Sequence, residues 1–81
     1  MRNLQERLSY CIVTVFPELS GEEIPRASYT SVANWNSLAI LTLVSVIEEE
    51  FCVSISIEEL GSMISFELIL DCLQKKDGHG S

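Results

Sequence analysis

Residues 34–51 read NWNSLAILTLVSVIEEEF, and this stretch decides the fold. Its first residues include two asparagines and a serine, whose side chains accept hydrogen bonds from the free N–H groups of a first helical turn. Apolar residues then recur at the three-and-four spacing of one helical face, at Ile40, Leu43, Val44, Ile47 and Phe51. No glycine or proline interrupts the pattern. The stretch therefore predicts a central helix from Ser37 to Glu50, with Ser37 in its first turn.

Two further helices flank this one in the sequence. An amphipathic helix is expected over residues 2–16, ended by Pro17, with an inner face of Leu4, Leu8, Cys11, Ile12 and Val15. Ser65 is expected to cap the last helix, whose inner stripe is Phe66, Ile69, Leu70 and Leu73. Lys75 and Lys76 lie in its final turn, where positive charge is favourable, and Gly78 is expected to end it.

The segments between the expected helices also have recognisable sequence patterns. Residues 18–33 show no period and predict a long loop, pinned to the core by Ile24, Tyr29 and Val32. Residues 52–55 predict an extended connector rather than a strand, because no partner strand is apparent. Ser56 and Glu59 have the spacing of a capping box, which predicts a short helix ending near Gly61.

These elements predict an all-α fold with three principal helices, one short helix and a long first loop. The chain has 81 residues, so we expect a single domain over residues 1–76 and a flexible tail over 77–81.

Charge and composition exclude several classes of function. The net charge is −7 with only five lysines and arginines, which argues against binding to nucleic acid or to an anionic membrane surface. Basic protein partners suit such a chain better. Neither a targeting segment nor a membrane span is apparent, and Cys11, Cys52 and Cys72 are expected to be buried, reduced thiols. We therefore expect a cytoplasmic protein without a metal site.

Self-contained catalysis is not expected. A nucleophilic serine needs a nearby base, and the single histidine, His79, lies two residues from the end of the chain. If Ser37 reacts, another protein supplies the catalytic groups. Otherwise Ser37 is an ordinary helix-start serine, and both interpretations are open at this point.

The acidic end of the central helix also needs an explanation. Glu48, Glu49 and Glu50 lie where carboxylates oppose the helix dipole, each by about 0.3–1 kcal/mol when exposed. They form either a docking surface for a basic partner or a solvated end kept for solubility. Helical spacing places Leu38, Thr42, Ser45 and Glu49 on one stripe, which would connect the surroundings of Ser37 with this acidic end.

Trp35-Asn36-Ser37-Leu38, followed by an apolar helix that ends in Ile47-Glu48-Glu49-Glu50-Phe51, resembles the acyl carrier protein family. The resemblance covers most of the chain and is closest to discrete carriers whose motif reads Trp-Asp-Ser-Leu. It implies a four-helix bundle in which a phosphopantetheinyl transferase attaches 4′-phosphopantetheine from coenzyme A to Ser37. The thiol of that arm would hold an acyl group as a thioester, so the carrier itself is not an enzyme.

The resemblance also implies roles for residues around Ser37. Partner enzymes, synthases or ligases with basic patches, would dock at Leu38, Thr42, Ser45, Glu48 and Glu49. The interior lined by Leu43, Ile47, Phe51 and Ile55 would shelter the carried chain. We expect the carrier to be a monomer.

The chain departs from the family at Asn36, where an aspartate is usual, and at Ala39 and Thr42, where fatty-acid carriers have acidic residues. Asparagine caps a helix about as well as aspartate, so the fold is unaffected, but a charge beside the attachment site is missing. We therefore expect a specialised fatty-acid-like or polyketide-like pathway. Two alternatives remain open: an aminoacyl or peptidyl carrier, and an unmodified helical interaction module with the same fold.

Overall fold

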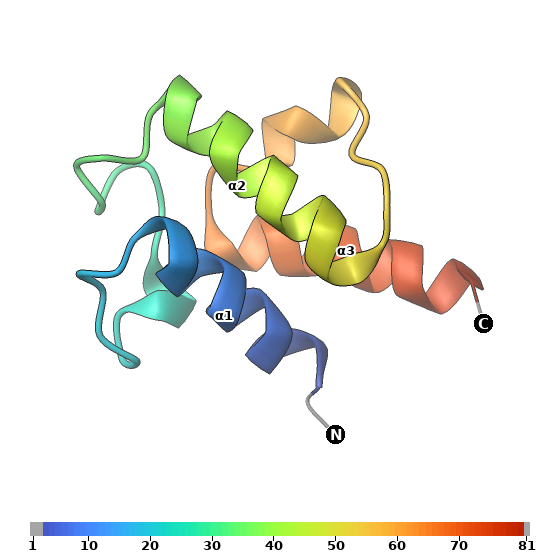
Figure 1. Ribbon diagram of the computed structural model, residues 1–81, viewed down its shortest axis with the longest axis horizontal. Coiled ribbons are helices and arrows are strands. Elements are labelled where there is room, and N and C mark those ends of the chain that lie inside the picture. The colour runs from blue at the N-terminus through green and yellow to red at the C-terminus, as the bar shows by residue number, and fades with distance from the viewer. Residues whose placement is uncertain (1–2, 81) are drawn as a thin grey trace.

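The computed structural model describes residues 3–80, with side chains up to residue 76. The described chain contains three α-helices and two short 3₁₀ helices, in the order α1 (Leu4–Val15), η1 (Ile24–Arg26), α2 (Ser37–Phe51), η2 (Glu58–Ser62) and α3 (Phe66–Gly80). Figure 1 shows α1 beside α2, with α3 running behind them. α1 packs against both α2 and α3, while η1 and η2 pack against α3. The expected all-helical architecture with three principal helices is confirmed.

The helix ends follow local capping chemistry. α1 begins at Leu4 because Asn3 and Glu6 form a capping box, in which the Asn3 side chain accepts from the Glu6 N–H at 2.8 Å. It ends at Val15, one residue earlier than expected, with Phe16 as its C-cap before Pro17. The Asn3 cap was not predicted from the sequence. Arg2, the expected first residue, lies outside the described part of the chain.

The other predicted caps are present. Ser65 Oγ accepts from the Leu68 N–H at 3.2 Å, and Ser56 and Glu59 exchange reciprocal bonds at 2.8 and 3.2 Å. The short helix after Ser56 is a 3₁₀ helix that ends at Ser62, one residue after Gly61. α3 continues to Gly80, so Gly78 does not end it as expected. The flexible tail over 77–81 stays a prediction, because Ser81 lies outside the described residues.

The core lies between the inner faces of the three helices. Its buried helical residues are Leu8, Cys11 and Ile12 of α1, Leu43 and Ile47 of α2, and Phe66, Ile69 and Leu73 of α3. The other residues expected on these inner faces, such as Leu4, Val15 and Leu70, are partly buried against this cluster. No charged or polar side chain is buried in the part of the chain whose side chains are described. The predicted registers of the three helices are therefore correct.

The long first loop is pinned to the core and to the start of α3. Ile24 and Val32 are buried as expected, whereas Tyr29 is 57% exposed, so its predicted role as an anchor is wrong. Backbone bonds from Tyr29 N–H to the Ile64 carbonyl and from Phe66 N–H to the Ala27 carbonyl, both 2.9 Å, anchor the loop instead. The loop consequently delivers the chain to Ser37 from a fixed position.

Candidate functional site

Ser37 is the first residue of α2, and its side chain is exposed to solvent. The Asn36 side-chain oxygen accepts from the Ala39 N–H at 3.0 Å, and the Asn36 carbonyl accepts from the Ile40 N–H at 2.9 Å. Within residues 3–80, neither the Ser37 hydroxyl nor the N–H groups of Ser37 and Leu38 have a hydrogen-bond partner. Free N–H groups and the positive end of the helix dipole favour an anionic group at this position.

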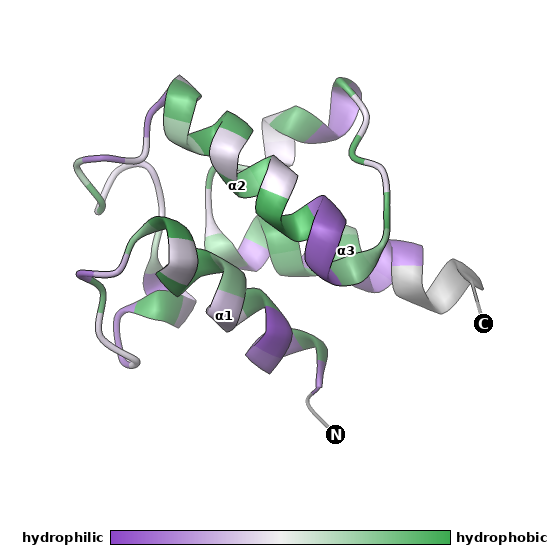
Figure 2. Cartoon of the chain, in the orientation of Figure 1, coloured by the Kyte–Doolittle hydropathy of each residue, from purple (hydrophilic) through white to green (hydrophobic). Residues whose placement is uncertain are grey.

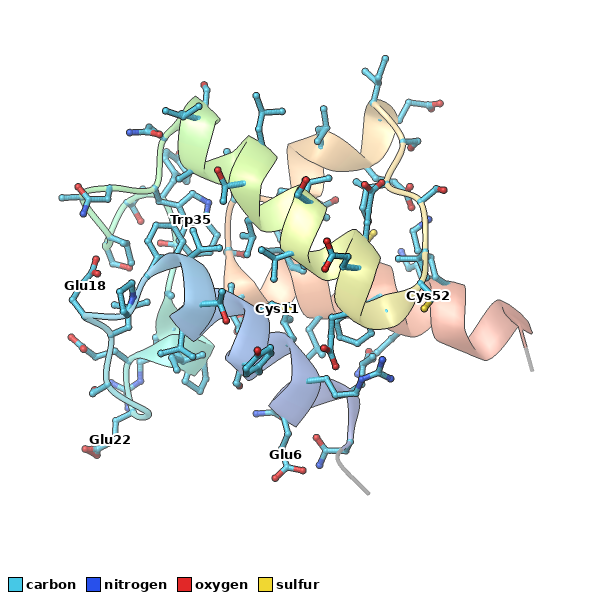
Figure 3. All side chains as sticks on the ribbon, viewed as in Figure 1. Glu6, Cys11, Glu18, Glu22, Trp35 and Cys52 are labelled. Carbon is cyan, nitrogen blue, oxygen red and sulfur yellow. The ribbon has the colours of Figure 1, made fainter. Side chains whose placement is uncertain are left out.

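Trp35 fixes the chain immediately before this helix. Its side chain is buried, its indole Nε1 donates to the Met63 carbonyl at 2.9 Å, and its ring stacks on Phe16 at 5.0 Å with an interplanar angle of 20°. Figure 3 shows Trp35 directed from the loop into the interior. Because the Trp35 side chain is anchored in the interior two residues before Ser37, the backbone at Ser37 is held in place on the surface.

The stripe predicted along α2 faces solvent. Leu38, Thr42, Ser45 and Glu49 are all exposed, and Leu38 is 73% exposed. Leu41, which was not predicted as part of this stripe, is also 59% exposed, so an apolar surface follows Ser37. Figure 2 shows that α2 becomes hydrophilic only near its last turn.

The three carboxylates at the end of α2 have different surroundings. Glu48 is half-buried, and its Oε2 accepts from the Ile55 N–H at 2.8 Å, which fixes the connector after the helix. Glu50 Oε2 lies 3.1 Å from Arg7 Nε of α1. Glu49 is exposed. Its backbone carbonyl accepts from the Cys52 thiol at 3.9 Å, but its carboxylate has no hydrogen-bond or ion-pair partner among the described residues and presents its charge to solvent.

Arg7 also relieves the conflict with the helix dipole. Its Nη2 donates to the Glu50 backbone carbonyl at 2.6 Å, and its guanidinium lies 4.5 Å from the centre of the Phe51 ring. The Arg7 guanidinium from α1 thus places a positive charge at the negative end of the α2 dipole, because the last turn of α2 has no basic residue of its own. Sequence reasoning overlooked this contact because its partners are 43 positions apart.

The residues expected to shelter a carried chain lie on the inner side of α2 and its connector. Leu43 and Ile47 have no exposed surface, whereas Phe51 and Ile55 are partly buried. An acyl chain entering between them would have to separate packed side chains. Their role in sheltering a chain stays a prediction.

A polar cluster joins η2 to α3. Lys76 Nζ lies 2.9 Å from Glu59 Oε2 and donates to the Ser54 carbonyl at 2.8 Å, and the Cys72 thiol lies 3.5 Å from the same Glu59 oxygen. The Ser56 N–H, followed by Lys76, lowers the pKa of Glu59 to about 2. These bonds hold the η2 turn against the last helix.

The cysteines differ in exposure. Cys11 is buried, and burial, followed by the Glu50 carboxylate, raises the pKa of its thiol to about 11. Cys72 is half-buried, and its pKa is raised by burial and then by Glu59. Cys52, however, is exposed at the left-handed residue that ends α2, with φ of 55°, so the expectation that all three are buried is wrong (Figure 3). The pattern of the helical residues before Cys52 does not indicate that its side chain is exposed.

The described residues contain neither a cluster of potential metal ligands nor a helix that could span a membrane. The histidine, cysteine, aspartate and glutamate side chains, as far as they are described, form no group of three suited to a metal ion. Among the helices of residues 3–80, none has the length and apolarity needed to cross a bilayer.

Comparison with known proteins adds no family to these observations. No protein-family model matches the chain, and no solved structure matches it significantly.

Proposed function

We propose that this protein is an acyl carrier whose Ser37 hydroxyl is the attachment point for 4′-phosphopantetheine. The observation that carries the proposal is the unpartnered Ser37 hydroxyl, exposed at the capped start of α2 beside two free backbone N–H groups. These N–H groups would hold the phosphate of the arm. The arm would supply a terminal thiol that carries an acyl group as a thioester. The all-helical architecture is compatible with this proposal, which takes η2 as the short fourth helix of an acyl-carrier-like four-helix bundle.

The chain itself provides the hydroxyl and the surface, and a transferase provides the catalysis. The Ser37 oxygen forms a bond to the phosphorus that carries the pantetheine part of coenzyme A. The bond from that phosphorus to the adenosine bisphosphate breaks, and the serine proton passes to a base of the transferase. No residue of the carrier acts as acid or base in this step.

The surface beside Ser37 would dock the partner enzymes. Leu38 provides an apolar contact, with Thr42 and Ser45 farther along the stripe, and Glu49 offers an exposed charge to a basic patch. Glu48 is expected to contribute less to docking, because its carboxylate already holds the connector through Ile55. The partners are a phosphopantetheinyl transferase and acyl or aminoacyl ligases or synthases of a specialised cytoplasmic pathway, and the carrier acts as a monomer.

Incubation with coenzyme A and a broad-specificity transferase tests the proposal. The intact mass should rise by one phosphopantetheine group, and Ser37→Ala should abolish the gain. An unchanged mass of the original chain, or an equal gain in the variant, would refute it.

Asn36 favours a second candidate, an unmodified interaction module that uses the same surface. It replaces the charge that carriers of the Trp-Asp-Ser-Leu type place beside the serine. This candidate expects the protein from its own host to be unmodified and to capture a partner through the acidic end of α2. Capture that is unaffected by Glu49→Lys would argue against it.

A further inference from the structure

A shallow groove of about 400 Å³ lies between the end of α1 and the start of α2. Asn36 and Leu38, which flank Ser37 in the sequence, both line it, whereas Ser37 itself does not, so the groove lies next to the first turn of α2. Thr14 and Val15 form its wall on α1, and Asn34 extends it along the first loop. Its volume is within the range of small-molecule sites.

The groove is uncharged, which is unusual in this acidic chain. No lysine, arginine, aspartate or glutamate lines it, whereas four other grooves on the described surface each include at least one charged side chain. An uncharged lining favours a neutral ligand, because an ionic ligand would lose hydration without gaining a partner charge.

The polar atoms in the groove suit amide groups. The Asn34 side-chain amide has no partner among the described residues, so it offers both a donor and an acceptor. Asn36 uses its oxygen for the helix cap, which leaves its NH₂ group to donate. The hydroxyls of Thr14 and Thr42 donate to backbone carbonyls, at 2.8 and 3.2 Å, so their oxygens remain able to accept. Val15 and Leu38 add apolar surface.

We propose that this groove is the resting site of the pantetheine arm attached to Ser37, an inference that rests on the proposed function. Between its phosphate and its thiol, the arm is neutral and consists of a branched dimethyl segment followed by amide groups. Val15 and Leu38 contact the dimethyl segment, and Asn34 hydrogen-bonds the amides. The arm therefore folds towards α1, on the side of the site opposite to η2, until a partner enzyme draws it out.

Nuclear magnetic resonance of the modified protein tests this placement. Conversion from the unmodified to the modified form should shift the methyl signals of Val15 and Leu38 and should give nuclear Overhauser effects between these methyls and the arm. Asn34→Ala should lower the ratio of docked to free arm about fivefold, the effect of one lost hydrogen bond. Thr42→Leu, which fills the groove, should abolish the contacts. Thr30→Leu, the same change at an exposed position of the first loop outside both the groove and the docking surface, should preserve them.

The possible failures are distinguishable. A modified protein whose Val15 and Leu38 signals do not change, or whose arm contacts residues of η2, overturns the groove and leaves the proposed function intact. Equal loss of arm contacts in Thr42→Leu and Thr30→Leu also overturns it. A chain that never gains the arm overturns both inferences.

Discussion

The side-chain oxygen of Asn36 accepts a hydrogen bond from the backbone N–H of Ala39 at 3.0 Å. This bond begins α2 without using the neighbouring Ser37 hydroxyl, which stays exposed. An aspartate at position 36 would make the same bond with one oxygen and present a charged second oxygen to a visiting enzyme. If Ser37 is modified as we propose, the asparagine at position 36 should therefore affect recognition by the transferase rather than folding.

Asn36→Asp should consequently accelerate the modification of Ser37. We expect a several-fold higher rate of phosphopantetheine transfer by a broad-specificity transferase, with the free energy of unfolding changed by less than about 0.5 kcal/mol. Rates from mass spectrometry and urea denaturation provide the two measurements. Asn34→Asp adds the same charge outside the cap and serves as the control. Equal rates for the two variants would show that position 36 is not read by the transferase.

Trp35→Phe should destabilise the protein by about 1–3 kcal/mol, because the buried Met63 carbonyl loses its indole donor. Urea denaturation measures the loss. Tyr29→Phe removes a polar group from an aromatic residue of the same loop that is 57% exposed, and it should change stability by less than about 0.5 kcal/mol. If the two variants lose the same stability, the Trp35–Met63 bond does not anchor the loop.

Glu59 should make stability depend on pH in the acidic range. Its pKa in the folded protein is about 2, below the ordinary value of 4.5, so the unfolded chain binds its proton first as the pH falls. The stabilisation from Glu59 should be complete above about pH 5 and should disappear as the pH falls from about 4.5 to about 2. The difference in unfolding free energy between the original chain and Glu59→Gln should shrink over this range.

Two lysine variants, Lys76→Met and Lys75→Met, test whether the Lys76 contact lowers the pKa of Glu59. Lys76→Met should raise the pKa of Glu59, as measured by carboxyl carbon NMR, because Lys76 Nζ lies 2.9 Å from its Oε2. Lys75→Met should have a much smaller effect, because Lys75 pairs with Asp71 instead. A Glu59 pKa that is the same in both variants would exclude the Lys76 contact as a cause.

The three thiols should react with a disulfide reagent in the order of their exposure. Cys52 should react first, Cys72 more slowly, and Cys11 only after unfolding, because burial disfavours its thiolate. Absorbance of the released reagent group follows the reaction, and Cys52→Ser should remove the fast phase. A fast phase that persists in this variant would contradict the assigned exposure of Cys52.

Sequence reasoning predicted what depends on local pattern. The start of α2 at Ser37 and the caps at Ser56 and Ser65 follow from residue spacing, as do the inner faces of the three helices. The stripe from Leu38 to Glu49 was also predicted to face outward, and its members are exposed.

The remaining features depend on contacts between distant segments. The bond from Trp35 to Met63 spans 28 positions, and that from Arg7 to Glu50 spans 43. Neither contact has a periodic signature, so the structural roles of Glu48 and Glu50 could not be predicted and both residues were expected only as part of an acidic helix end. The groove beside Ser37 likewise depends on how the end of α1 meets the start of α2. The exposure of Tyr29 and Cys52 is set by loop and turn geometry that apolar composition alone does not reveal.

The most direct test of the central claim is the fragmentation mass spectrum of the protein after incubation with coenzyme A and a broad-specificity transferase. We predict a single phosphopantetheine group on Ser37 and none on the exposed serines Ser31 and Ser45, with no modification of Ser37→Ala. An unmodified chain, or a group attached at another serine, would contradict the assignment of Ser37 as the attachment point.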